Sequence, residues 1–246
     1  MKKITTILSV FGLTATVFAQ GTINWSAPGS AFIGQTNATA YSSFVASSGS
    51  PTGGTTGNTV GGATSLFYYA LLTSTGLSAA PTSLSAFNSG SGTLANSWMS
   101  TGLTMTNGTA ANGRVSPVGG VVANAVASNW ADQSTQNIIM VGWSANLGST
   151  WSAALGNLNN WAAFGAGVSG NAYFGVCSSV GSQTLSTANP GATVIGVNAG
   201  QINGAAVGGS PLVMNLLQVT AVPEPSTIAL AGLAGVGLLA LRRRNK

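Results

Sequence analysis

"NIIMVGW", residues 137–143, is an apolar run from which we infer the fold class. Its apolar residues follow one another without a helical period, and branched and aromatic side chains dominate it. Short runs of this kind, bounded by polar residues, are typical of β-strands. The same pattern predicts strands at "GTINWS" (residues 21–26), "LFYYALLT" (66–73), "AYFGVC" (172–177), "TVIGV" (193–197) and "PLVMNLLQVT" (211–220).

The connections between these runs are rich in glycine and asparagine. Asn-Gly pairs occur at residues 107–108, 112–113 and 203–204, and such pairs suit tight hairpin turns because both residues tolerate positive φ. Short strands separated by turn residues are typical of two packed sheets. We therefore predict a mainly β fold, an antiparallel β-sandwich of jelly-roll-like type with one short helix.

The helix is predicted within "STWSAALGNL", residues 149–158. Trp151, Ala154, Leu155 and Leu158 recur at the spacing of one helical face, and Ser149 or Thr150 precedes them as a cap. Gly156 predicts an early end, because glycine disfavours helix.

Residues 20–221 are expected to form one β-rich exported domain with an internal loop. In residues 46–65, 15 of the 20 residues are Ser, Thr or Gly. A segment of this composition buries little apolar surface, which predicts a flexible loop between strands.

Charge is almost confined to the two ends of the chain. Charged residues make up 4% of the sequence, against roughly 25% in an ordinary soluble domain. Between residues 20 and 221 only Arg114 and Asp132 are charged. Nucleic-acid binding requires a basic surface, so we exclude nucleic acid as a partner of this domain.

The side chains that most enzymes use are scarce. The chain has no histidine, and the domain contains one cysteine, one aspartate, no glutamate and no lysine. Metal sites, triad mechanisms and paired-carboxylate hydrolysis therefore lack their usual groups. We predict no enzymatic activity, no cofactor and no metal site. An enzyme with an unusual mechanism is the third-ranked alternative.

Two further features have plain interpretations. "GAGVSG", residues 165–170, spells a dinucleotide-binding fingerprint, but no acidic residue follows about 20 positions later and a strand-like run comes next. We interpret it as coincidence in a glycine-rich chain. Cys177 lies in an apolar run, which predicts a buried small side chain in preference to a reactive thiol.

Four tryptophans lie close together in the sequence and admit two interpretations. Exposed rings would stack on sugars, so Trp130, Trp143, Trp151 and Trp161 are candidate carbohydrate-stacking residues. The alternative, which we favour, is that these rings fill the core and the helix closes over them. Polar residues around them, in "GWSANLG" (142–148) and "LNNWAA" (158–163), are able to hydrogen-bond sugars in either case.

The N-terminus has the features of a secretory signal peptide. Lys2 and Lys3 precede an apolar stretch, and "VFA" at residues 17–19 offers a cleavage site after Ala19. We predict a signal peptide at residues 1–19; a retained anchor helix is the alternative.

The C-terminal segment, residues 222–246, combines three features. Pro223, Glu224 and Pro225 come first, then an uncharged run that ends at Leu241, and then a basic end. Sixteen residues of helix, 226–241, reach about 24 Å, short of the roughly 30 Å hydrocarbon core. The basic end, Arg242, Arg243 and Arg244, favours a short transmembrane helix whose C-terminus stays cytoplasmic.

These three features in this order resemble the PEP-CTERM sorting signal of exported bacterial proteins. The resemblance implies recognition by an exosortase, a membrane enzyme that processes its substrates near the signal. It assigns Pro223, Glu224, Pro225, Arg242, Arg243 and Arg244 to the sorting signal. The domain is also similar to low-charge members of that family that begin with "AQGT" and carry "TW-AAL".

The sequence leads us to expect a non-enzymatic surface or extracellular-matrix protein associated with exopolysaccharide or biofilm. It would be exported, anchored in the membrane by the C-terminal helix before processing, and then located at the cell surface or outside the cell. The alternative is a carbohydrate-binding adhesin that uses the tryptophans. Removal of both ends leaves a formal charge near zero, which favours self-association.

Overall fold

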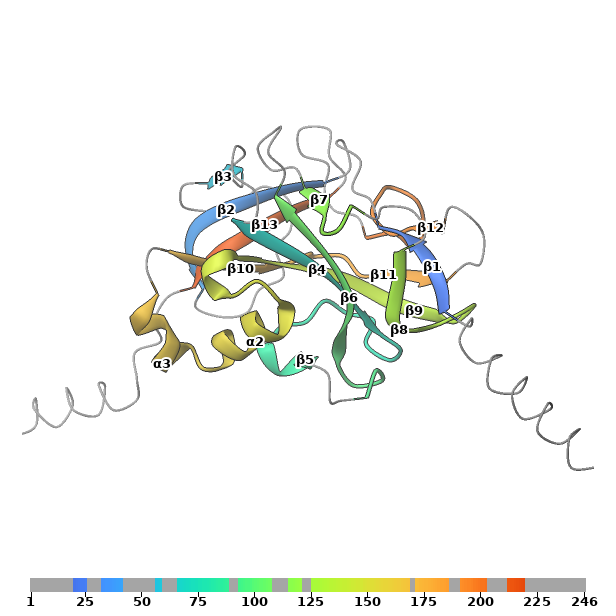
Figure 1. Ribbon diagram of the computed structural model, residues 1–246, viewed down its shortest axis with the longest axis horizontal. Coiled ribbons are helices and arrows are strands. Elements are labelled where there is room, and N and C mark those ends of the chain that lie inside the picture. Colours follow the sequence, from blue (N-terminus) through green and yellow to red (C-terminus); the bar gives the residue numbers. More distant parts are fainter. Residues whose placement is uncertain are drawn as a thin grey trace, which may run out of the picture.

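Strands dominate the described part of the chain in the computed structural model (Figure 1). The structure describes residues 20–25, 32–41, 56–58, 66–88, 93–107, 115–120, 125–168, 171–185, 191–202 and 212–219. The predicted signal peptide and the C-terminal sorting segment lie outside these ranges. The mainly β prediction is confirmed for the described residues.

The main sheet has ten strands. Its order is β3-β2-β13-β10-β9-β4-β6-β5, with β11 paired to β9 and β7 paired to β6. These strands are β2 (Phe32–Tyr41), β3 (Thr56–Asn58), β4 (Phe67–Ser74), β5 (Phe87–Asn88), β6 (Trp98–Asn107), β7 (Val115–Pro117), β9 (Thr135–Ser144), β10 (Ala172–Val176), β11 (Gly181–Thr184) and β13 (Leu212–Val219).

A three-stranded sheet lies beside β6 at the end of the molecule drawn on the right of Figure 1. Its order is β12-β1-β8, formed by β1 (Gln20–Asn24), β8 (Ala125–Ala131) and β12 (Ala192–Thr193). The predicted alternation at β1 is confirmed, because Ile23 and Trp25, which directly follows the strand, are both buried.

Both sheets are mixed, so the purely antiparallel arrangement predicted from the sequence is wrong. The pairs β2–β13, β5–β6 and β1–β12 are parallel, whereas the remaining pairs are antiparallel. The pair β2–β13 joins the two ends of the domain, and β13 lies between β2 and β10. Turn residues specify only hairpins between consecutive strands, so local sequence contains no signal for this long-range parallel pairing.

The strands β4 and β9 form the buried centre of the main sheet. Every residue of β9 from Ile138 to Ser144 is buried, as is almost all of β4. Successive side chains of a strand point to opposite faces. On one face Trp143 contacts Trp151, and on the other Tyr69 contacts Phe32 and covers Gly142. Because both faces are covered, "NIIMVGW" is continuously apolar and does not alternate.

The predicted helix is confirmed as α2 (Trp151–Asn159), and it lies on one side of the main sheet in Figure 1. The Thr150 side chain caps it by accepting a hydrogen bond from the backbone N–H of Ala153 at 3.3 Å. Its buried residues are the predicted set, Trp151, Ala154, Leu155 and Leu158. The early end at Gly156 is wrong, because packing of the buried face outweighs the low propensity of one exposed glycine.

Helical structure is not limited to α2. A second, four-residue helix, α3 (Trp161–Phe164), follows it directly, so the prediction of a single helix is corrected. Single 3-10 turns occur at η1 (Leu84–Ala86), η2 (Ala145–Leu147) and η3 (Gly165–Gly167). Among the described residues, no helix has both the length and the apolar character needed to cross a membrane.

Two predicted connections differ from expectation. Within the loop predicted at residues 46–65, Thr56–Asn58 form β3 and pair with β2. The rest of this loop lies outside the described residues. Asn107 is itself paired with Val115 in β7, so the connection between β6 and β7 is longer than the two-residue turn predicted there, and Gly108 lies outside the described residues. The Asn107 side chain instead accepts hydrogen bonds from the backbone N–H groups of Leu66 and Phe67, each 2.9 Å long. The other two Asn-Gly pairs lie outside the described residues.

Candidate functional sites

Three of the four candidate stacking tryptophans are buried. The exposed fractions of Trp130, Trp143 and Trp151 are 2%, 0% and 3%. The indole N–H of Trp130 donates to the Ser134 carbonyl at 2.8 Å, and that of Trp143 donates to the Gly148 carbonyl at 2.7 Å. A buried ring has no free face for a sugar, so the stacking role is corrected for these three residues. Trp161 is half-buried and packs against Phe164.

The buried rings form an aromatic core between the sheet and α2. The ring centroids of Trp143 and Trp151 are 5.8 Å apart, and Trp151 contacts Phe87 edge to face at 5.2 Å. Phe174 stacks on Trp151, with the two ring centroids 6.3 Å apart. The interpretation that these tryptophans fill the core and the helix closes over them is therefore confirmed for Trp143 and Trp151.

Cys177 is buried, as predicted. The backbone N–H of Met140 donates to its sulfur at 3.0 Å, and the thiol donates to the Ser179 carbonyl at 3.2 Å. Burial raises the pKa of the Cys177 thiol to about 12, although these backbone hydrogen bonds act in the opposite direction. A thiol with this pKa stays protonated at neutral pH and is a poor nucleophile.

We expect Cys177 to resist thiol reagents at pH 8 in the native protein and to react once the protein unfolds. The free energy of unfolding should also fall as the pH rises above 9. The unfolded thiol ionises near its ordinary pKa of 9.0, whereas the native thiol keeps its proton up to about 12, so ionisation favours the unfolded state. Denaturant titrations of the native sequence and of Cys177→Ala at pH 8 and pH 10.5 measure this difference. A native thiol that reacts at pH 8 as fast as the unfolded one would contradict the expectation.

The glycine motif at residues 165–170 lacks the context of a nucleotide site. Helix α3 and the turn η3 occupy residues 161–167, and strand β10 follows. A dinucleotide-binding loop requires a strand before it and a helix after it. The interpretation of this motif as coincidence is confirmed.

A cluster of uncharged polar side chains gathers where β9, β10 and β13 come together. It consists of Ser144, Asn146, Asn171, Tyr173 and Gln218, and we call it the amide–tyrosine cluster. Ser144 ends β9 and Asn146 lies in η2, whereas Asn171 precedes β10. Tyr173 lies on β10, and Gln218 is its partner on β13. Strand pairing therefore brings together residues up to 74 positions apart (218 − 144).

Hydrogen bonds link all five members of the amide–tyrosine cluster. The Ser144 hydroxyl accepts from the Tyr173 backbone N–H at 2.8 Å and donates to Asn146 Oδ1 at 2.6 Å. Asn146 Nδ2 donates to the Asn171 carbonyl at 3.1 Å. Asn171 Nδ2 donates to the Tyr173 hydroxyl at 3.4 Å and Gln218 Nε2 to Asn171 Oδ1 at 3.2 Å. These bonds hold the polar groups in fixed orientations.

Sequence reasoning identified only part of this cluster. Ser144 and Asn146 belong to "GWSANLG", a segment whose polar residues the sequence predicts to be able to hydrogen-bond sugars. Asn171, Tyr173 and Gln218 were missed, because each is an ordinary residue of a strand or of its flank. Only the register of β10 against β9 and β13 brings them to the same place.

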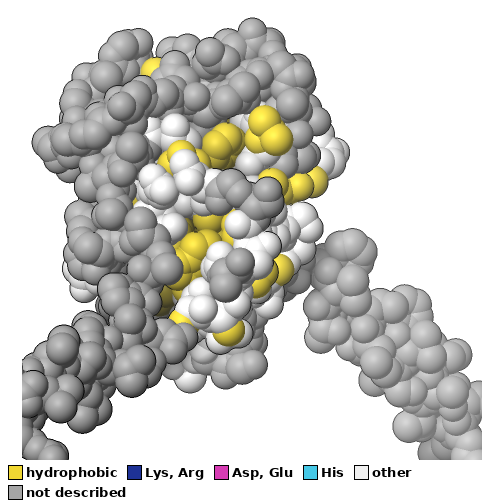
Figure 2. Space-filling model, turned by 90° about the vertical axis from the view of Figure 1, so that its left-hand side faces the viewer, with side chains coloured by type: hydrophobic (Ala, Val, Ile, Leu, Met, Phe, Trp, Pro, Cys, Tyr) yellow, Lys and Arg dark blue, Asp and Glu magenta, His cyan; other side chains and the backbone are white. Residues whose placement is uncertain are grey.

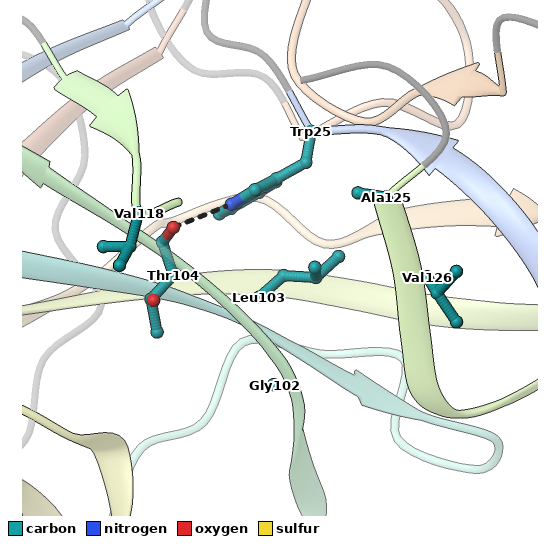
Figure 3. A pocket seen from close by; sticks show the side chains of 7 residues that line it. All are labelled: Trp25, Gly102, Leu103, Thr104, Val118, Ala125 and Val126. Atoms are coloured by element: carbon teal, nitrogen blue, oxygen red, sulfur yellow. Dashed lines mark hydrogen bonds between the residues drawn. The ribbon is translucent and has the colours of Figure 1, made fainter. Parts of the chain in front are cut away.

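A shallow groove of about 430 Å³ lies between β6 and β8 (Figure 3). It is lined by Trp25, Gly102, Leu103, Thr104, Val118, Ala125 and Val126. The Trp25 indole N–H donates to the Thr104 carbonyl at 3.2 Å across it. Val118 and Val126 are partly exposed, whereas no lining residue carries a charge. The groove therefore offers apolar contact and few groups that would orient a polar ligand.

Comparison with known proteins identifies the C-terminal segment. Residues 221–244 match the family described as the PEP-CTERM protein-sorting motif, which confirms the resemblance seen in the sequence. The matched range contains Pro223, Glu224, Pro225 and the three arginines, all of which lie outside the described residues. No curated protein and no solved structure has a significant match to this chain.

The matched motif defines a class of protein. It implies an exported protein that is associated with the membrane before processing. Such a protein is a substrate of an exosortase, the membrane enzyme that recognises this motif.

Proposed function

We propose that this chain is a non-enzymatic surface or extracellular-matrix protein that an exosortase sorts and that associates with exopolysaccharide or biofilm material. The observation that carries the proposal is the PEP-CTERM motif at residues 221–244. The motif specifies where the protein is sorted and not what it does there. The function at the cell surface or in the matrix therefore belongs to the domain at residues 20–221.

The side chains of the domain support a non-enzymatic role. Asp132 is its single carboxylate, and the sequence contains no histidine. Cys177, the one cysteine, is buried with a raised pKa. General acid–base or nucleophilic catalysis needs a titratable group that reaches the substrate, and this domain has few of them.

The sorting segment has a physical rationale for its order. Pro223 and Pro225 restrict the backbone to extended conformations, which suits entry into a protease-like cleft. The apolar helix predicted at residues 226–241 would hold this stretch at the membrane surface, and Arg242, Arg243 and Arg244 would keep the end of the chain on the cytoplasmic side. Glu224 would be a recognition residue and not a catalytic one.

Replacing Glu224 by alanine should leave unprocessed or mislocalised protein, because the signal loses its only charge before the arginines. The measurement is intact mass spectrometry of surface and membrane fractions from the producing cells. Ser226→Ala, two residues away, is the matched control and should be processed normally. If the surface form of the native protein still contains Lys246, then the segment is a permanent anchor and processing does not occur.

The alternative is an adhesin that stacks sugars on the tryptophan cluster, but three of those four tryptophans are buried in the core.

Self-association remains part of our proposal. After both ends are removed, Arg114 and Asp132 cancel, and long-range repulsion between molecules is weak. For a protein that accumulates in a matrix, association of this kind is compatible with the role.

A further inference from the structure

We propose that the amide–tyrosine cluster is a binding site for an uncharged polysaccharide. This inference rests on the proposed association with exopolysaccharide and gives it a place on the molecule. It differs from the adhesin alternative, because the binding groups are side-chain amides and a phenol and not the buried indoles.

The cluster has hydrogen-bonding capacity left after its internal bonds are made. A primary amide has two donors and an oxygen with two lone pairs. Gln218 uses one donor, towards Asn171, and its oxygen accepts no bond from the described residues. The Tyr173 hydroxyl accepts from Asn171 and retains its own proton to donate. Adjacent sugar hydroxyls are both donors and acceptors, so they match this mixed set.

The cluster is accessible and has an apolar neighbour. Asn171 is exposed, and Tyr173 and Gln218 are half-buried. The ring centroids of Tyr173 and Phe67 are 6.4 Å apart, and Leu66, which precedes Phe67 in the sequence, is 40% exposed. Aromatic side chains with a polar end suit surfaces that are apolar in one part and wet in another. The C–H groups of a sugar ring would lie against this apolar part while its hydroxyls reach the amides.

The charge of the surroundings favours an uncharged ligand. All five members of the cluster are neutral, and Asp132 is the only charged side chain among the described residues. In Figure 2, which views the side on which α3 lies in Figure 1, the described atoms are yellow or white, and none has the colour of a charged side chain. The described residues offer an anionic polysaccharide no cationic side chain, so it would lose hydration there without compensation.

The internal hydrogen bonds also reduce the cost of binding. Side chains that are already held in place lose little conformational freedom when a ligand arrives. The Ser144 hydroxyl anchors Asn146 and the backbone of Tyr173, and Asn171 joins Tyr173 to Gln218. The cluster is therefore preorganised, whereas the groove between β6 and β8 has few polar groups to arrange.

The test is frontal affinity chromatography of the mature protein recovered from the producing cells, because a protein with a net charge near zero does not migrate in an electric field. The columns carry dextran or hydroxyethyl cellulose as uncharged chains and alginate as an anionic chain. We expect retardation by at least one uncharged chain and none by alginate. Gln218→Ala and Tyr173→Phe should each weaken binding about three- to tenfold, the change expected from one hydrogen bond. Asn159→Ala, at the exposed end of α2, is the matched control and should bind like the native protein.

Three results would overturn the site: no retardation by either uncharged chain, stronger retardation by alginate, or Gln218→Ala and Tyr173→Phe binding as tightly as Asn159→Ala. Thermal unfolding of each variant shows whether that variant is folded. Gln218→Glu keeps the size of the side chain and provides a second test of whether residue 218 contributes to binding. Processing of the C-terminal segment is measured on the same samples. Normal processing with no polysaccharide binding refutes the site alone, whereas failed processing refutes the sorting function.

Discussion

Trp143→Ala is expected to lower the free energy of unfolding by about 3–5 kcal/mol, the range found when a large buried aromatic side chain is truncated. Trp143 is fully buried at the centre of the main sheet and contacts Trp151. Tyr68 stacks on it at 6.0 Å on β4. Alanine would leave a cavity between the sheet and α2 and would leave the Gly148 carbonyl without the indole donor.

Thermal unfolding of the mature protein followed by circular dichroism measures this effect. For a domain of about 200 residues, we expect the melting temperature to fall by roughly 6–20 °C. Trp161→Ala is the matched control, because Trp161 is half-buried on the short helix α3 and should cost much less. Equal losses for the two variants would show that the aromatic core is not the main source of stability.

Gly175→Val should destabilise the protein by about 3 kcal/mol or more, because the main sheet has no room for a side chain at this position. Gly175 on β10 is paired with Gly142 on β9. A Cβ at Gly175 would meet the backbone carbonyl of Asn215 and lie 3.0 Å from Leu216 Cδ2. The Asn215 carbonyl belongs to the neighbouring strand and moves only if the two strands separate. The clash therefore cannot be relieved without loss of strand pairing.

The control for this prediction is a glycine with open space around it. Nothing lies within 4 Å of a Cβ placed at Gly156, on the exposed face of α2. Gly156→Ala should therefore raise the free energy of unfolding by roughly 0.5–1 kcal/mol, since alanine is the better helix former. Chemical denaturation of both variants gives the two values. A neutral Gly175→Val would mean that β10 and β13 are not packed as described.

The elements that the sequence predicted well are those whose signal is local. The strands β4, β9, β10 and β13 are runs of apolar side chains, and β1 alternates. Helix α2 has both a cap and a buried face at helical spacing. In contrast, β2 ("FIGQTNATAY"), β6 ("WMSTGLTMTN") and β8 ("AVASNWA") were missed, because their polar and small residues resemble loops. They are strands because their neighbours pair with them.

The sorting motif and the scarcity of catalytic side chains were readable from the sequence by itself, since both depend on which residues are present and on their order. Which tryptophans are buried, which strands run parallel and which amides meet at Tyr173 were decided only by the tertiary structure. The parallel pairing of β2 with β13 and the gathering of Ser144, Asn171 and Gln218 join residues far apart in the chain. Local secondary-structure propensity does not predict such contacts, because their free energy arises from burial and strand pairing that exist only after the chain has folded.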